Sequence, residues 1–151
     1  MDPKGQNIDE DYHIRVHADP ADIPGSAWDA LLATQARPTP FMRHAYLAAL
    51  QASGSAVPAT GWTARFLTLE SPAGLMAAAP LYLKTHSYGE YVFDWAWADA
   101  YRRHGLRYYP KLLCAVPFTP VPGSRLLARD ARWRARLVQA IGALAQDGGQ
   151  S

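Results

Sequence analysis

The chain has 151 residues and a formal net charge of +2; 49% of its residues are hydrophobic, 19% charged and 11% aromatic. This length suits one domain and leaves little room for two. A single cysteine excludes a disulfide framework and any multi-cysteine zinc or iron–sulfur site. The polar N-terminus lacks the basic and apolar regions of a signal peptide, and no apolar run is long enough to span a membrane, so we expect a cytoplasmic protein.

The first half of the chain is predicted to contain one strand and two helices. Apolar and polar residues alternate over 12–17, which indicates a half-buried strand after a disordered leader at 1–11. Ser26 has an acid, Asp29, three residues further on, and this capping-box pattern predicts the start of the first helix. The second helix is predicted over 42–53.

Two strands are predicted next, over 63–70 and 75–84, and they are joined by a turn at 71–74. Pro80 lies inside the second strand. A proline has no N–H to donate to a β-ladder. We therefore predict that this strand belongs to an antiparallel sheet and that Pro80 occupies a bulge or an unpaired position.

The second half is predicted to alternate strands and helices. A short strand is expected over 88–93, followed by a helix that begins with Asp94 as its cap and ends near His104. A further apolar strand is predicted over 111–116. Asp130 is expected to cap the last helix.

This order of elements predicts an α/β or α+β fold, with a mostly antiparallel central sheet of about five strands and helices on both faces. No strand is predicted after the last helix to pair with that sheet. We therefore expect residues 12–147 to form one domain, the N-terminal half of a longer protein, with 148–151 as a tail.

Charge is distributed unevenly along the chain. Residues 1–30 hold seven acids and two bases, whereas 101–136 hold nine bases and one acid. A basic surface attracts phosphates or nucleic acid, but arginine is also common on solvent-exposed helix faces. Because no nucleic-acid-reading motif accompanies these bases, we favour exposed helix faces.

Aromatic side chains are concentrated in 82–118, which contains ten of the 17 aromatics with carboxylates interleaved. Trp95 and Trp97 are two residues apart on a predicted helix, so one core-facing side cannot hold both rings. We predict that at least one ring is exposed beside a hollow that Tyr91 or Tyr108 also lines. Two alternatives stay open: the exposed ring is an interface covered by the other half of the longer protein, or both rings cover the ends of a small core. The candidate ligand-binding residues are Tyr91, Asp94, Trp95, Trp97, Asp99, Tyr108 and Lys111.

Three other kinds of site are not favoured by the residues. The five histidines lack metal-ligand spacing, so no metal site is expected. Cys114 lies in an apolar strand with no base beside it, which indicates an inert thiol. Residues 102–107 partly match the R-x-x-G-x-[GA] loop that binds acyl-coenzyme A. They end a predicted helix instead of beginning one, so the helix dipole has the wrong sign for a phosphate.

Long strings of this sequence resemble a known bacterial family. They are PLYLKTHSYGEYVFDWAWADAY at 80–101, YYPKLLCAVPFTPVPGSRLL at 108–127 and PFMRHAYLAALQASGS at 40–55. The family is FemAB-like, labelled peptidoglycan biosynthesis/recognition, within the wider GNAT-like acyltransferase superfamily. The resemblance covers nearly all of 41–127. It implies a GNAT-like fold, with a second, C-terminal GNAT-like domain of the same protein as a partner.

The resemblance also implies an N-acyltransferase or aminoacyltransferase that acts on an amine acceptor, which is a small molecule or a peptidoglycan precursor. The implied donor is acyl-coenzyme A or an aminoacyl-tRNA held by the longer protein. We expect the present chain to hold no cofactor and to be inactive alone, and no catalytic residue follows from the resemblance. Two alternatives stay open: a non-catalytic module that recognises a glycan or peptide, and an RNA-binding domain, with tRNA as the nucleic acid concerned.

Overall fold

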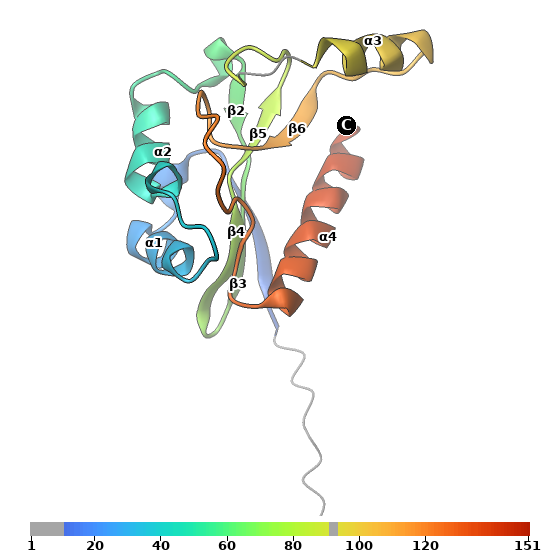
Figure 1. The fold of residues 1–151 in the computed structure, drawn as a ribbon. Helices are drawn as coiled ribbons and strands as arrows, with labels where there is room; N and C mark the ends of the chain where they lie inside the picture. Colours follow the sequence, from blue (N-terminus) through green and yellow to red (C-terminus); the bar gives the residue numbers. More distant parts are fainter. Residues whose placement is uncertain (1–10, 91–93) are drawn as a thin grey trace, which may run out of the picture.

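The computed structural model describes residues 11–90 and 94–151 (Figure 1). Its helices are α1 (Gly25–Ala33), α2 (His44–Ala52), α3 (Trp95–Arg103) and α4 (Ala131–Gly148). Its strands are β1 (His13–His17), β2 (Trp62–Ala64), β3 (Phe66–Ser71), β4 (Gly74–Ala79), β5 (Leu81–Lys84), β6 (Lys111–Cys114) and β7 (Leu127–Ala128). Short 3-10 turns lie at Pro20–Asp22, Pro40–Met42 and Pro58–Thr60. Within the described part of the chain, no helix combines the length and apolar character that a membrane crossing requires.

The protein has an α+β fold, but its strands form two antiparallel sheets instead of the single sheet of about five strands that we expected. The larger sheet has the order β1-β3-β4-β7 and the smaller has the order β2-β5-β6. Both are built on one long hairpin, in which β2 and β3 form one arm and β4 and β5 form the other. The GNAT-like character of the fold stays a prediction.

The long hairpin passes from one sheet to the other at Pro80. The two arms keep the same register on both sides of this point, and Pro80 lies between β4 and β5, outside both ladders. Its C=O accepts a hydrogen bond from the N–H of Ala115 (3.3 Å). In an antiparallel strand, the N–H and C=O of one residue point toward the same neighbouring strand. The N–H that proline lacks would therefore point to the side where β6 pairs with β5 and β7 pairs with β4. Pro80 itself belongs to neither of these ladders. The predicted unpaired position of Pro80 is confirmed.

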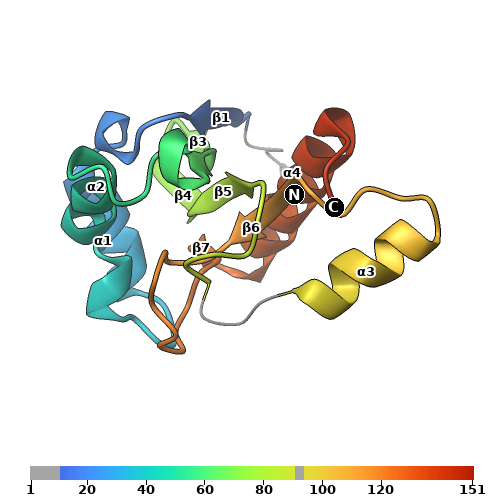
Figure 2. The same ribbon diagram turned by 90° about the horizontal axis from the view of Figure 1, so that it is seen from above.

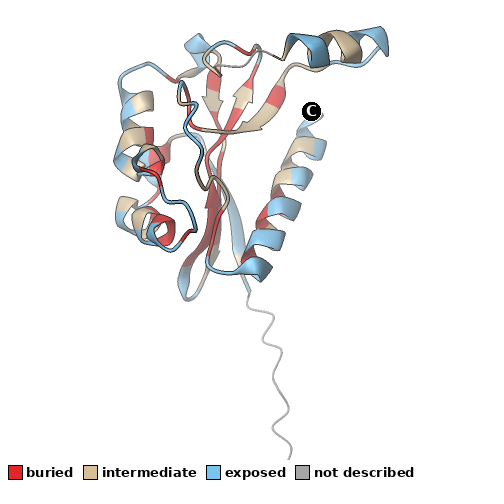
Figure 3. Cartoon of the chain, viewed as in Figure 1, coloured by how far each residue is buried: buried red, intermediate tan, exposed pale blue. Residues whose placement is uncertain are grey.

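Helices cover both faces of the four-stranded sheet, as expected. α1 and α2 lie on one face and α4 lies on the other (Figures 1 and 2). The alternation of side chains along β3 places Phe66 in the core with α1 and α2, where it stacks on Trp28 with 5.7 Å between ring centroids. Leu67 and Leu69 lie in the second core, with the fully buried Trp133 of α4. Figure 3 shows that buried positions are concentrated along the central strands.

The starts of two helices test the predicted caps. α4 follows Asp130, whose carboxylate accepts from the N–H of Trp133 (2.9 Å), so this cap is confirmed. The capping box at Ser26 is wrong, because α1 begins at Gly25 after Pro24 and Ser26 lies inside the helix. Asp29 instead accepts from the N–H of His44 (2.9 Å), the first residue of α2. That acid therefore caps the next helix of the chain.

Two further predictions fail around the smaller sheet. The strand expected over 88–93 is wrong for residues 88–90, which form a turn with Gly89 at a φ of +82°, and 91–93 lie outside the described residues. The short strand β7 was not predicted at all. At the other end of the chain, the C=O of Ser151 accepts from the N–H of Leu112 (2.9 Å), so residues after α4 lie beside β6.

Candidate functional site

Helix α3 stands away from the two cores. It projects from the end of the three-stranded sheet, on the opposite side of the molecule from α1 and α2 (Figures 1 and 2). None of the residues Trp95–Arg103 is buried, and Trp95 and Trp97 are 69% and 65% exposed. The prediction that at least one of these rings is exposed is confirmed. The helix exposes both, because it has no face that packs into a core.

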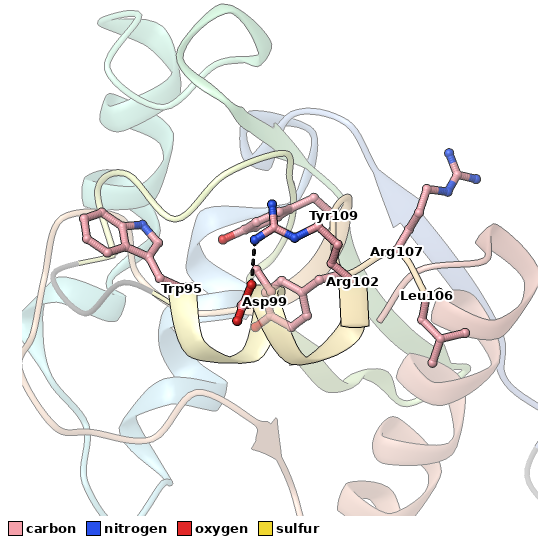
Figure 4. A pocket seen from close by; sticks show the side chains of 8 residues that line it. Trp95, Asp99, Arg102, Leu106, Arg107 and Tyr109 are labelled. Carbon is pink, nitrogen blue, oxygen red and sulfur yellow. Dashed lines mark hydrogen bonds and ion pairs between the residues drawn. The ribbon is translucent and has the colours of Figure 1, made fainter. Parts of the chain in front are cut away.

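A hollow of about 490 Å³ lies beside α3. It is lined by Trp95, Ala98, Asp99, Arg102, Leu106, Arg107, Tyr108 and Tyr109 (Figure 4). Tyr108 therefore lines a concavity next to an exposed tryptophan, as predicted. Asp99 and Arg102 face each other between Trp95 at one end and Leu106 and Arg107 at the other. Trp97 is exposed but is not part of this lining. Tyr91, the remaining aromatic candidate, lies outside the described residues.

The only predicted carboxylate that lines the hollow, within the described chain, is held by two arginines. Oxygens of Asp99 lie 2.6 Å from Nη2 of Arg102 and 2.5 Å from Nη2 of Arg103. The hydrogen bond from Arg102 and the charge of Arg103 hold the pKa of Asp99 below its usual range. Asp99 is therefore an anion that can attract a cationic group but is a poor base.

Beside the hollow lies a group of ionisable side chains that we call the charge cluster. Lys84 and Lys111 are its buried members, and Glu90, Asp94 and Tyr108 are half-buried. Nζ of Lys111 donates to Oε1 of Glu90 (2.5 Å) and to Oδ2 of Asp94. The hydroxyl of Tyr108 donates to the same oxygen of Asp94 (2.7 Å). Lys111 is 4% exposed. We predicted that Lys111 contacts the ligand, but here it is buried below the hollow and outside its lining.

Asp94 has a different role from the helix cap that we predicted. It occupies the position before α3, but its carboxylate bonds to Lys111 and Tyr108 instead of to the helix N-terminus. A cation forms a stronger hydrogen bond with a carboxylate than a backbone N–H does, which explains the choice. Burial opposes ionisation of Asp94, but the hydrogen bonds from Lys111 and Tyr108 outweigh it and lower its pKa. For Lys111 the bonds to Asp94 and Glu90 likewise outweigh burial and raise its pKa.

Two members of the cluster, Glu90 and Lys84, are absent from the candidates predicted from the sequence, and the more buried of the two is Lys84. It is fully buried, donates to the C=O of Tyr88 (2.5 Å) and lies 3.7 Å from Oε2 of Glu90. Its Nζ also lies 3.7 Å from the centre of the Trp62 ring. Burial lowers the pKa of Lys84 to about 8. Only the pairing of β5 with β6 brings Lys84 opposite Lys111, and no local pattern in the sequence indicates that pairing.

A metal site, a reactive thiol and an acyl-coenzyme A loop are the three site types that the sequence did not favour. Within the described residues, no group of three or more metal-ligating side chains lies together. Burial raises the pKa of Cys114 to about 12, which keeps the thiol protonated and unreactive. α3 ends at Arg103, and Gly105 follows at a φ of +69°, so the segment 102–107 ends a helix as predicted.

The basic face of α4 is partly occupied by contacts within the protein. The guanidinium of Arg136 lies 4.7 Å from the Trp133 ring and 4.9 Å from the Tyr12 ring. Arg134 donates to Oε1 of Gln35 (3.2 Å). These two arginines pack against apolar and polar neighbours within the protein, and the expectation that the basic residues only solvate helix faces stays a prediction.

Comparison with known proteins gives one match. No curated relative and no solved structure matches the chain. The sequence model of the FemAB-like family, described as peptidoglycan biosynthesis/recognition, matches residues 19–151. The match includes α3, the residues that line the hollow and all members of the charge cluster. The chain belongs to the FemAB-like family of peptidoglycan biosynthesis/recognition.

Proposed function

We propose that the hollow beside α3 binds the acceptor of an acyl- or aminoacyl-transfer reaction, and that this acceptor is an amine-bearing peptidoglycan precursor. One observation carries the proposal: an exposed tryptophan, a carboxylate and guanidinium groups line the same concavity. Its volume of about 490 Å³ is within the range of small-molecule sites. Membership of a family linked to peptidoglycan supports the choice of acceptor.

Each kind of side chain in the hollow matches one part of such an acceptor. The rings of Trp95 and Tyr109 offer flat apolar surfaces for the carbon-rich faces of a sugar or peptide. Asp99 is ionised, and its carboxylate oxygens can accept a hydrogen bond from the ammonium group of a diamino acid in addition to those from its arginines. Arg107 and Arg102 offer guanidinium groups to a peptide carboxylate.

The chemistry proposed for the longer protein is attack of the acceptor amine on an activated ester. A C–N bond forms and the amine loses a proton. With an aminoacyl-tRNA the C–O bond of the ester breaks and the alcohol leaves; with acyl-coenzyme A the C–S bond of the thioester breaks and the thiol leaves. Asp99 is a poor base for that proton because two arginines hold it as an anion. The residues of this chain therefore bind and orient the acceptor, while the donor, acyl-coenzyme A or aminoacyl-tRNA, is held elsewhere in the longer protein.

The same weakness of Asp99 as a base favours a second candidate, a recognition module that binds peptidoglycan fragments without reaction. The two candidates share the hollow and differ in one measurable product. If transfer occurs, full-length protein given the precursor and a donor yields a precursor of increased mass in mass spectrometry. If the module only recognises, the precursor is bound and its mass is unchanged.

Binding is tested by calorimetric titration of the chain with soluble UDP-N-acetylmuramyl pentapeptide. Trp95→Ala should weaken binding about tenfold, since loss of an aromatic contact removes about 1 kcal/mol or more. Trp97→Ala is a matched control, because this ring is on the same helix and similarly exposed but does not line the hollow. Wild-type protein that does not bind the pentapeptide, or two variants with equal affinity, would contradict the proposal.

A further inference from the structure

We infer that Lys111 is a positioning residue that sets the shape of the hollow from below, without touching the ligand. This inference rests on the proposed function of the hollow and adds to it the residue that fixes the walls. Lys111 is the first residue of β6 and pairs with the last residue of β5, so its backbone is held by the three-stranded sheet. Its side chain bonds to Asp94, the residue before α3, and so links α3 to the sheet.

Within the described residues, none of Trp95–Arg103 is buried, so the apolar contacts of α3, such as that of Tyr101 with Tyr108, stay at the surface. Polar contacts lie at the base of the helix. The carboxylate of Asp94, the residue directly before α3, bonds to Nζ of Lys111. The N–H of Asp94 donates to Oγ of Ser87 (3.2 Å), whose hydroxyl also bonds to that of Tyr109. The position of α3 therefore depends on the hydrogen bonds that Lys111 and Ser87 form with Asp94.

Both ends of the hollow depend on the same carboxylate. Trp95 follows Asp94 directly and forms one wall. Tyr108 forms part of another wall and donates to Asp94 (2.7 Å). Lys111 thus bonds to the oxygen of Asp94 that also accepts from Tyr108. The ring of Tyr108 in turn contacts that of Tyr101 on α3, with 5.1 Å between centroids.

Burial makes this contact specific to a cation. The side chains of Lys111 and Glu90 are 5% and 8% exposed. Within the described chain, Asp94 without Lys111 would keep only the hydrogen bond from Tyr108, and Glu90 would keep only the longer contact with Lys84 (3.7 Å). A carboxylate that loses its nearest cation in such surroundings is costly, so Lys111 holds both carboxylates in their positions. Removal of the cation should release Asp94 toward solvent and move Trp95 and Tyr108 apart.

The test uses Lys111→Met together with a variant that avoids unpaired charge, Asp94→Asn/Lys111→Met, which leaves the buried Lys84–Glu90 pair in place. The second variant keeps side-chain size at the cluster, so it protects the test from simple failure to fold. Lys111→Arg retains the cation and should restore the behaviour of the wild type. Arg15→Met is the matched control, since it removes a cation from the Arg15–Glu70 pair on β1 and β3, far from the hollow.

Two measurements need no ligand. In a Trp97→Phe background, quenching of fluorescence by acrylamide reports on Trp95, because Trp28, Trp62 and Trp133 are fully buried. Trypsin cleavage after Arg102, Arg103 and Arg107 reports on the release of α3. We expect altered quenching and faster cleavage for both variants that lack the cation, and wild-type behaviour for Lys111→Arg and Arg15→Met.

The third measurement is affinity for UDP-N-acetylmuramyl pentapeptide, which should fall about tenfold or more in the variants that lack the cation, because displaced binding groups lose their alignment. A folded double variant, Asp94→Asn/Lys111→Met, with wild-type quenching and cleavage would overturn the inference. If wild-type protein does not bind the pentapeptide, the proposed function fails, but the ligand-free measurements still decide the role of Lys111.

Discussion

Lys84 and Lys111 lie directly opposite each other in the ladder between β5 and β6, and both are buried. Like charges at facing positions of a sheet normally repel. Here Glu90 lies between them, 3.7 Å from one Nζ and 2.5 Å from the other. Glu90, which lies in a turn outside the sheet, thus offsets the repulsion between the two facing lysines.

Glu90→Gln should therefore destabilise the protein strongly. The variant leaves two facing cations with one fewer anion, and loss of one partner from a buried pair costs about 3–5 kcal/mol. Urea unfolding measures the change. Glu70→Gln is the matched control, since Glu70 pairs with the exposed Arg15 and should change stability by about 0–1 kcal/mol. Equal effects of the two variants would mean that the cluster contributes no more than a surface pair.

The lowered pKa of Lys84 makes stability depend on pH. The unfolded lysine titrates near 10.5 and the folded one near 8, so the unfolded state binds more protons between these values. The free energy of unfolding should therefore rise as pH increases through 8. Thermal melts between pH 7 and 9.5 should show this rise for the wild type and a flatter profile for Lys84→Met. Both proteins in this comparison should also carry Cys114→Ala. The raised pKa of that thiol would otherwise lower the free energy of unfolding as pH increases above 9.

The cap of α4 provides a test with an internal comparison. Asp130→Ala removes the acceptor for the N–H of Trp133 and should cost about 1 kcal/mol. Ser26→Ala should change stability by only a few tenths, about 0.3 kcal/mol, because Ser26 lies inside α1 instead of at its cap. Urea unfolding of both variants checks this difference. A loss at Ser26 as large as that at Asp130 would contradict the assigned helix start.

The basic face of α4 should bind RNA weakly. Arg134 and Arg136 already contact Gln35, Tyr12 and Trp133, so they have little freedom to follow a phosphate backbone. Filter binding with tRNA should show weak affinity that disappears near physiological salt, where the Debye length is about 8 Å. Tight binding that persists at that salt concentration, with a steep salt dependence, would favour an RNA-binding role instead.

Local patterns in the sequence predicted most elements of the fold and the exposed tryptophans. The proline at position 80, the acid at 130 and the spacing of Trp95 and Trp97 each act through the backbone nearby, and each prediction is confirmed. The splitting of the sheet was not predictable in this way. It depends on where β6 and β7 pair along the long hairpin, and those contacts are distant in sequence.

The errors at the candidate site have the same origin. Asp29 lies inside α1 and Asp94 directly precedes α3, and a local pattern assigns each to its own helix. The structure gives each a distant partner, His44 for Asp29 and Lys111 for Asp94. Lys84 was missed because a lysine at a strand end is usually solvated. Its burial follows from Trp62 and Glu90, which approach it only in the folded chain.

The segment 85–110 leaves the sheet at Lys84 and returns at Lys111, which face each other across adjacent strands. Two antiparallel strands that end at such a pair can be joined by a two-residue turn. The whole excursion can therefore be excised, provided that both lysines become apolar, since Glu90 and Asp94 leave with it. The shortened chain would retain both apolar cores. Conversely, the excised segment can be transplanted to another hairpin that offers two facing lysines, and the fold and the recognition surface can change independently of each other.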